Sequence, residues 1–179
     1  MTIEKTFIKD LLILHPAVFE DERGYFLESY NKKSLASKLD VEFVQDNESM
    51  SHKGVLRGLH FQKPPFAQGK LVRVITGSVL DVVVDLRKDS STYGKHYKHI
   101  LSVKNKTQLY VPKGFAHGFL VLEDHTIFSY KCTNYYHKEA ESALLWNDVT
   151  LHIDWEIENP IISEKDKNAE YFTNFVSPF

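Results

Sequence analysis

Apolar and polar residues alternate along the middle of the chain, and this alternation predicts β-strands. Within residues 79–87 the apolar and polar side chains take opposite faces. One face carries Leu80, Val82, Val84 and Leu86, and the other carries Asp81, Asp85 and Arg87. This two-residue period is that of a half-buried strand. The preceding run, residues 71–75, also has strand composition, and Gly77 and Ser78 separate the two. We therefore expect a hairpin here.

Similar short runs recur along the chain, separated by turn residues. They predict strands near residues 6–8, 11–14, 42–47, 99–103, 108–111, 115–122 and 126–133. Arg23 and Gly24 predict a turn that leads into a strand, and Asn31 is expected to cap a short helix reaching Leu39. The strand spacing is typical of an all-β sandwich or barrel, and the 12 Phe and 9 Tyr residues favour strands as well.

Size and charge narrow the function classes. A chain of 179 residues predicts one domain, spanning residues 1–179. The net charge of −2 argues against binding nucleic acid or a membrane surface through bulk charge, so an anion would have to be bound locally. Cys132 is the only cysteine, and the N-terminal residues lack the apolar core of a signal peptide. No apolar run reaches membrane-spanning length, so we expect a soluble, cytoplasmic protein.

His60 lies in the apolar run 54–62, and it is the first candidate for chemistry. A buried imidazole needs a hydrogen-bond partner, and it can act as a base near neutral pH. A core histidine with a purely structural hydrogen bond is the alternative, and for a histidine taken alone it is favoured. The sequence holds no His-x-His, His-x-x-x-His or Glu-x-x-His spacing, and His117 meeting His60 across a barrel would be a weak metal signal.

Two further groups of residues carry candidate chemistry. Arg23, Arg57, Lys70 and Arg73 lie in turn-to-strand contexts, and arginine forks suit the oxygens of a diphosphate. Ordinary surface ion pairing is the alternative for each of them. His60, Tyr130 and Asp166 have acid–base side chains, but composition alone does not indicate that they meet. Tyr130 and Asp166 equally suit a tyrosine at the edge of the core and a solvated loop acid.

Nine segments, taken in order, give a more specific indication. They are Asp21-Glu-Arg-Gly24, Gln45-Asp-Asn47, Gly54-Val-Leu-Arg-Gly-Leu-His60, Gly69-Lys-Leu-Val-Arg73, Asp81-Val-Val-Val-Asp-Leu-Arg87, Val111-Pro-Lys-Gly-Phe-Ala-His-Gly-Phe119, Tyr130-Lys-Cys-Thr-Asn-Tyr-Tyr136, Leu145-Trp-Asn-Asp148 and Ser163-Glu-Lys-Asp166. Together they resemble the dTDP-4-dehydrorhamnose 3,5-epimerase family over nearly the whole chain. One segment is weak evidence, whereas nine in sequence are very specific.

The resemblance implies a cupin-like jelly-roll barrel of antiparallel strands with a few short helices, working as a homodimer. It implies an epimerase without metal or cofactor that inverts C3 and C5 of dTDP-4-dehydro-6-deoxy-D-glucose in dTDP-L-rhamnose synthesis. By this resemblance His60 is the base with Asp166 as its partner acid, Tyr130 is the proton donor, and Lys70 lies beside the sugar carbonyl. The implied substrate contacts are Arg23, Glu28, Gln45, Asp46, Asn47, Arg57, His117, Glu141 and Lys165.

Other functions remain open at this point. The same residues would serve a one-centre 3- or 5-epimerase. A nucleotide-sugar binding module without turnover would share the fold. A metal-dependent cupin oxygenase is a further alternative. One local conflict is also predicted. Strict alternation sends Arg57 and His60 to opposite faces of a strand, although the resemblance places both on the substrate. If both line one site, we expect a bulge or bend at Gly58.

Overall fold

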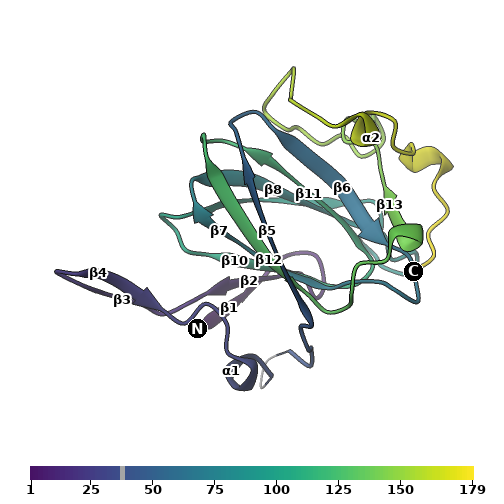
Figure 1. Cartoon of the computed structure of the whole chain (residues 1–179). Helices are drawn as coiled ribbons and strands as arrows, with labels where there is room; N and C mark the ends of the chain where they lie inside the picture. Colours follow the sequence, from purple (N-terminus) through teal and green to yellow (C-terminus); the bar gives the residue numbers. More distant parts are fainter. Residues whose placement is uncertain (37–38) are drawn as a thin grey trace.

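Two antiparallel sheets face each other in the computed structural model, which describes residues 1–36 and 39–179 (Figure 1). The six-stranded sheet has the order β1 (Thr2–Lys5), β2 (Leu12–His15), β10 (Gln108–Val111), β7 (Lys70–Thr76), β12 (Thr126–Cys132) and β5 (Gln45–Ser51). The five-stranded sheet has the order β13 (Glu141–Ala143), β6 (Leu56–Gln62), β11 (Phe115–Val121), β8 (Ser78–Asp85) and β9 (His96–Ser102). These strands build the predicted cupin-like jelly roll.

The remaining elements are short. Strands β3 (Val18–Asp21) and β4 (Gly24–Leu27) form a hairpin that extends away from the barrel (Figure 1). The helical elements are α1 (Lys32–Ala36), η1 (Lys138–Ala140), α2 (Glu164–Lys167) and η2 (Phe172–Asn174). In the part of the chain that the structure describes, none of the helices has the length and apolar character needed to cross a membrane.

The space between the sheets holds the main core. Val72 of β7 and Val83 of β8 are fully buried there, and the rings of Phe119 and Phe128 stack with centroids 4.2 Å apart. Fully burying a side chain of this size stabilises the fold by about 1.5–3 kcal/mol. The phenylalanine pair joins β11 of one sheet to β12 of the other, so this core fixes the two walls of the barrel relative to each other.

A second apolar layer corrects the prediction for β8. Leu80 and Val82 point away from the barrel and pack in one cluster with Trp155 and Phe175 of the C-terminal segment. Because this segment covers the outer face, all eight residues of β8 are buried, and the strand is not half-buried as its alternation predicted. Its polar positions therefore lie inside the protein, where a carboxylate such as that of Asp81 requires a partner.

The predicted hairpin between residues 71–75 and 79–87 is wrong. Strands β7 and β8 belong to different sheets, and Gly77 turns the chain from one to the other. Gly77 has a φ of +80°, and a Cβ atom added there would lie 2.2 Å from the hydroxyl of Thr126. Only glycine fits this corner, because the backbone is left-handed and closely packed.

The N-terminal elements follow the prediction in part. The first strand is Thr2–Lys5, while the hydroxyl of Thr6 bonds the carbonyls of Ile8 and Leu11, so residues 6–8 form a turn rather than the expected strand. Asn31 caps α1 as predicted, its side-chain oxygen accepting from the Ser34 N–H at 3.1 Å. The expected helix reached Leu39. The described part of α1 is Lys32–Ala36, residues 37–38 lie outside the described residues, and Leu39 is not helical.

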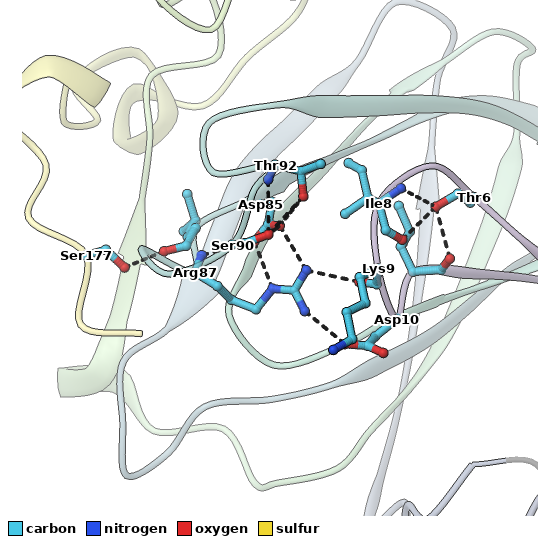
Figure 2. A network of polar contacts seen from close by, with 11 residues as sticks. Thr6, Ile8, Lys9, Asp10, Asp85, Arg87, Ser90, Thr92 and Ser177 are labelled. Carbon is cyan, nitrogen blue, oxygen red and sulfur yellow. Dashed lines mark hydrogen bonds and ion pairs between the residues drawn. The ribbon is translucent and has the colours of Figure 1, made fainter.

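A polar network closes the barrel where β8 ends (Figure 2). Arg87 donates to the Asp85 carboxylate at 2.8 Å, to Asp10 at 3.1 Å and to the Lys9 carbonyl at 3.0 Å. Ser90 and Thr92 also donate to Asp85. Burial by itself raises the pKa of the Asp85 carboxyl, but the hydrogen bonds from Arg87 and the two hydroxyls outweigh it and hold the pKa below its ordinary value. The network ties the N-terminal turn to the β8–β9 connection.

Candidate active site

His60 and Asp166 form a partly buried pair. His60 is on β6, Asp166 is on α2, and the His60 Nε2 and Asp166 Oδ1 atoms lie 2.6 Å apart. Ser163 caps α2 by accepting from the Asp166 N–H, which fixes the helical turn beneath the carboxylate. The side chain of Asp166 is only 4% exposed, whereas that of His60 is 31% exposed. The histidine thus reaches the cleft while its partner stays covered.

The Asp166 carboxyl remains ionised in this setting. Burial raises its pKa, but the hydrogen bond and charge of His60, together with donation from Ser163 and from the Gly58 N–H, bring the pKa below the ordinary value. An ionised carboxylate can only accept, so the nitrogen facing it, Nε2 of His60, carries the proton. In the neutral imidazole, Nδ1 is then the nitrogen that can accept a proton.

A bulge at Gly58 brings Arg57 to the same side as His60. His60 pairs with His117 and Arg57 pairs with Phe119, so β6 carries one residue more than β11 across this stretch. Gly58 has a φ of +135°, and an added Cβ would lie 2.4 Å from the Gly118 Cα. The expected irregularity at Gly58 is therefore found, and it resolves the conflict between alternation and a shared site.

Lys70 and Tyr130 form the opposite wall, which comes from the six-stranded sheet. The Lys70 Nζ atom lies 5.8 Å from the centroid of the Tyr130 ring. Burial lowers the pKa of Lys70, and burial raises the pKa of Tyr130. A tyrosine with a raised pKa holds its proton more firmly in the resting site, as a proton donor must.

The cleft between these walls has an outer and an inner part. The outer part is about 320 Å³ and the inner part about 140 Å³, and His60, Lys70 and Tyr130 line both. The outer part is also lined by Gln45, Asn47, Phe61, Gln62, Gln68, Tyr136 and Glu141. The inner part is also lined by Ser49, Arg57, His117, Phe119 and Phe128.

Two residues that line the cleft, Arg57 and His117, are oriented by hydrogen bonds to other side chains. Arg57 donates to the Ser51 hydroxyl at 3.0 Å and 3.2 Å. His117 lies 2.8 Å from Asp81 of β8, measured from its Nε2 atom to the carboxylate, and both side chains are buried. His117 is thus the partner that the buried carboxylate of Asp81 on β8 requires.

The rim of the cleft carries an ion pair and an aromatic ring. Lys165 lies 2.6 Å from the Glu141 carboxylate, to which the Tyr136 hydroxyl also donates at 3.0 Å. Burial raises the pKa of Glu141, but the Lys165 and Tyr136 hydrogen bonds hold the pKa below its ordinary value. Tyr136 itself is 54% exposed. An exposed aromatic ring at a cleft mouth suits a planar ligand group.

Three predicted contact residues lie apart from this cleft within one chain. Asp46 lies between Gln45 and Asn47 on β5, so its side chain takes the other face and pairs with Lys131 at 2.8 Å. Arg23 is at the turn of the β3–β4 hairpin, where its side chain is 85% exposed and pairs with Asp21 (Figure 1). Glu28 follows the hairpin and accepts from Asn31.

Three polar residues of the outer part of the cleft were missed by the sequence analysis. Tyr136, Gln62 and Gln68 line the outer part, although none was a candidate. Gln62 is two positions after His60 on β6, so strand alternation alone could have placed it on the same face. Tyr136 and Gln68 are in connections outside the strands, where no periodicity indicates a direction.

The fold and site define a jelly-roll protein in which a histidine–carboxylate pair faces a lysine and a tyrosine across a cleft. The family model for dTDP-4-dehydrorhamnose 3,5-epimerase matches residues 5–174. The protein of that name from Shigella flexneri is 52% identical over 176 residues, covering 97% of both chains. The chain belongs to the dTDP-4-dehydrorhamnose 3,5-epimerase family, whose members are isomerases.

Solved structures agree with this assignment. The dTDP-4-dehydrorhamnose 3,5-epimerase from Elizabethkingia anophelis is 53% identical, with a TM-score of 0.93 and 97% of both chains covered. The Legionella pneumophila enzyme, solved with dTDP-4-keto-L-rhamnose, is 46% identical with a TM-score of 0.93, covering 98% of this chain and 94% of that one. A 3'-monoepimerase from Streptomyces bikiniensis, in complex with dTDP-quinovose, is 29% identical with a TM-score of 0.89, covering 94% and 86%.

Proposed function

We propose that the protein inverts C3 and C5 of dTDP-4-dehydro-6-deoxy-D-glucose, giving dTDP-4-dehydro-L-rhamnose for dTDP-L-rhamnose synthesis. One observation carries the proposal: His60 and Tyr130 project into a single cleft from opposite sheets. Inversion needs a proton removed from one face of the sugar and another delivered to the opposite face. A base and an acid on facing walls meet that need.

His60 is the base of the proposed reaction. The C4 ketone acidifies the hydrogens at C3 and C5, and Nδ1 of His60 takes one of them. The electron pair left on carbon moves into the carbonyl, so an enolate oxygen develops at C4. Lys70, in the wall opposite His60, stabilises that oxygen as a cation. A charge that is buried in the cleft interacts more strongly than it would in water.

Tyr130 is the acid that completes the inversion. Its phenol donates a proton to the carbon from the face opposite His60, and the enolate electron pair forms the new C–H bond. Once His60 has released its proton to solvent and Tyr130 has regained one from solvent, the same pair of groups serves the second carbon, because C3 and C5 are both adjacent to the C4 ketone. Burial raises the pKa of Tyr130, which keeps the phenol protonated before the enolate forms.

The nucleotide is bound by the remaining cleft residues. Arg57 presents its guanidinium to the inner part, where it suits a diphosphate oxygen, and the half-exposed Tyr136 ring offers a stacking surface for the base. Glu141 and Lys165 at the rim, Gln45 and Asn47 on β5, and His117 in the inner part supply polar contacts.

The working unit of the proposal is a homodimer. Phe19 and Phe26 face one another across the β3–β4 hairpin and are 65% and 68% exposed. Exposed aromatic side chains on a projecting hairpin are typical of an interaction surface. We propose that the hairpin packs on a second copy of the chain and brings Arg23 and Glu28 to the partner's cleft. This arrangement accounts for their distance from the cleft of their own chain.

Light scattering at micromolar concentration tests the dimer. The wild-type chain should have twice the monomer mass, and the double substitution Phe19→Ser/Phe26→Ser should shift it to monomer with a raised KM. A monomeric wild-type protein would exclude the dimer. If Arg23→Ala left both KM and dTDP affinity unchanged, the hairpin would not contribute to the site.

Proton NMR in deuterium oxide tests the reaction. The purified protein is given dTDP-4-dehydro-6-deoxy-D-glucose, and configuration and deuterium are followed at C3 and C5, with a downstream reductase to trap the product. Inversion and exchange at both carbons are expected. Because a related protein is a 3'-monoepimerase, exchange at one carbon is the competing outcome, and it would reassign the chain to one-centre epimerisation. Binding without exchange would indicate a binding module, and metal-dependent turnover would indicate different chemistry.

A further inference from the structure

The connection between β12 and η1 is held by glutamine side chains. Residues 133–137 are in neither a helix nor a strand, so their backbone groups lack regular partners. Gln68 donates to the Asn134 carbonyl at 2.7 Å, and Gln45 accepts from the Tyr136 N–H at 2.9 Å. Gln62 bonds both residues flanking Tyr136. All three glutamines line the outer part of the cleft.

Gln62 makes the largest share of these contacts. Its amide nitrogen donates to the Phe66 carbonyl at 2.7 Å and to the Tyr135 carbonyl at 3.1 Å. Its amide oxygen accepts from the His137 N–H at 2.7 Å. Gln62 is only 5% exposed, so water is poorly placed to replace any of these bonds. The side chain uses both of its donor hydrogens and its acceptor to join the β6–β7 and β12–η1 connections.

The two connections also contact each other directly. The rings of Phe66 and His137 stack with centroids 3.8 Å apart and an interplanar angle of 14°. Tyr136 lies between the two residues that Gln62 bonds, and its side chain lines the cleft. The Gln62 amide therefore holds the backbone on both sides of Tyr136, and through that backbone it acts on the position of the ring.

We infer that Gln62 is a positioning residue for nucleotide binding, holding the 134–137 connection so that the Tyr136 ring is preset at the cleft mouth. The inference rests on the proposed function, in which Tyr136 stacks on the base. Preordering matters because a connection that is mobile in the free protein must be ordered at the expense of binding free energy. Gln62 acts on affinity and not on the proton-transfer steps, because its hydrogen bonds go to Phe66, Tyr135 and His137.

The side chain must be an amide for this role. Gln62→Glu keeps the shape and the acceptor for His137 but turns the donor nitrogen into an oxygen facing the Phe66 and Tyr135 carbonyls. Gln62→Met keeps the length and removes all three bonds. Both substitutions should loosen the connection without altering His60, Lys70 or Tyr130.

Calorimetric binding of dTDP, with KM and kcat for the sugar nucleotide, provides the test. Gln62→Met and Gln62→Glu should each weaken dTDP binding about five- to tenfold and raise KM to match, the scale of one base–aromatic stack. The kcat value should stay within about twofold of wild type. Gln68→Met removes a single hydrogen bond from the same connection and should weaken dTDP binding by a smaller factor. This variant replaces the Gln62 variants in the test if those do not fold.

A double-mutant cycle separates positioning from direct contact. If Gln62 acts through Tyr136, the double substitution Gln62→Met/Tyr136→Ala should bind dTDP no more weakly than Tyr136→Ala alone. Thr92→Val is the control: it removes a hydrogen bond to Asp85, lines neither part of the cleft, and should leave dTDP affinity unchanged even if the melting temperature falls.

The outcomes are distinct. Unchanged dTDP affinity in Gln62→Met, additive effects in the cycle, or a matched loss in Thr92→Val would each overturn the positioning role. If Tyr136→Ala left dTDP affinity unchanged, the stacking part of the proposed function would fail instead. Weak binding in both single variants, with no further loss in the double variant, supports the inference.

Discussion

Replacing Asp166 by asparagine tests the origin of the base. In the wild-type protein the carboxylate accepts from His60 Nε2 at 2.6 Å, and the backbone N–H of Gly58 helps to lower its pKa. An asparagine offers one oxygen and one NH2 group. Because the Gly58 N–H requires an oxygen, the NH2 group should turn to His60. Nε2 must then accept, the imidazole proton moves to Nδ1, and the nitrogen that faces the sugar is no longer a base.

The expected loss follows from this tautomer change. The Asp166 side chain is 4% exposed, so water cannot easily restore an acceptor at Nε2. Comparable amide substitutions behind a catalytic histidine lower kcat about 10⁴-fold. We therefore expect Asp166→Asn to lower kcat by about 10³- to 10⁴-fold, or about 4–5.5 kcal/mol in the barrier. Affinity for dTDP should not change, since the proposed function assigns the nucleotide to other cleft residues.

The assay measures kcat, KM and deuterium exchange, with dTDP binding and a melting curve on the same samples. Glu164→Gln is the matched control, because it makes the same carboxylate-to-amide change on α2 at a side chain that is 82% exposed and pairs with Lys167. The control should keep wild-type kcat. If Asp166→Asn kept kcat within tenfold of wild type while folding normally, the role of the carboxylate in setting the tautomer would be refuted.

Three further predictions follow from the site and the fold. Tyr130→Phe should slow inversion about 10²- to 10⁴-fold while deuterium still enters from the His60 side with configuration retained, and NMR showing no exchange would contradict this division of roles. Lys70→Met should lower kcat about 10²- to 10³-fold with dTDP affinity unchanged. Because burial lowers the Lys70 pKa, the wild-type rate should begin to fall, as the pH is raised, before the pH reaches the ordinary lysine value of 10.5. Asp85→Asn should cost about 2–4 kcal/mol in urea unfolding at pH 7. Because the folded pKa of Asp85 is depressed, this difference should shrink as the pH falls through that pKa, and a pH-independent difference would contradict the ion-pair reading.

The fold class could be predicted from the sequence because strand alternation is a local property. The positions of most strands and the Asn31 cap follow from residues a few places apart. The pairing of β7 with β8 was predicted wrongly, because neighbouring strands with a glycine between them equally suit a hairpin and a corner between two sheets. The burial of β8 was missed for a related reason: the residues that cover its outer face, such as Trp155, come from a distant part of the chain.

The candidate site, like the fold, could be predicted from the sequence only in part. His60, Tyr130 and Asp166 were named through the resemblance of ordered segments, whereas residue type and spacing gave no reason for them to meet. Their meeting depends on contacts between residues 106 positions apart, such as His60 and Asp166. Gln62 shows the limit most clearly, because its three partners are backbone groups, and backbone groups carry no sequence signal.

The sequence by itself determined the family, the strand-rich architecture and the bulge at Gly58, because each rests on ordered motifs, local periodicity or the steric freedom of one residue. Tertiary structure alone decided which wall His60 and Tyr130 occupy, and it left Arg23 on the β3–β4 hairpin, outside the lining of the cleft of its own chain. It also turned the polar face of β8 inward, so that Asp81 meets His117 instead of water. These features follow from packing between distant segments, which local propensities do not encode.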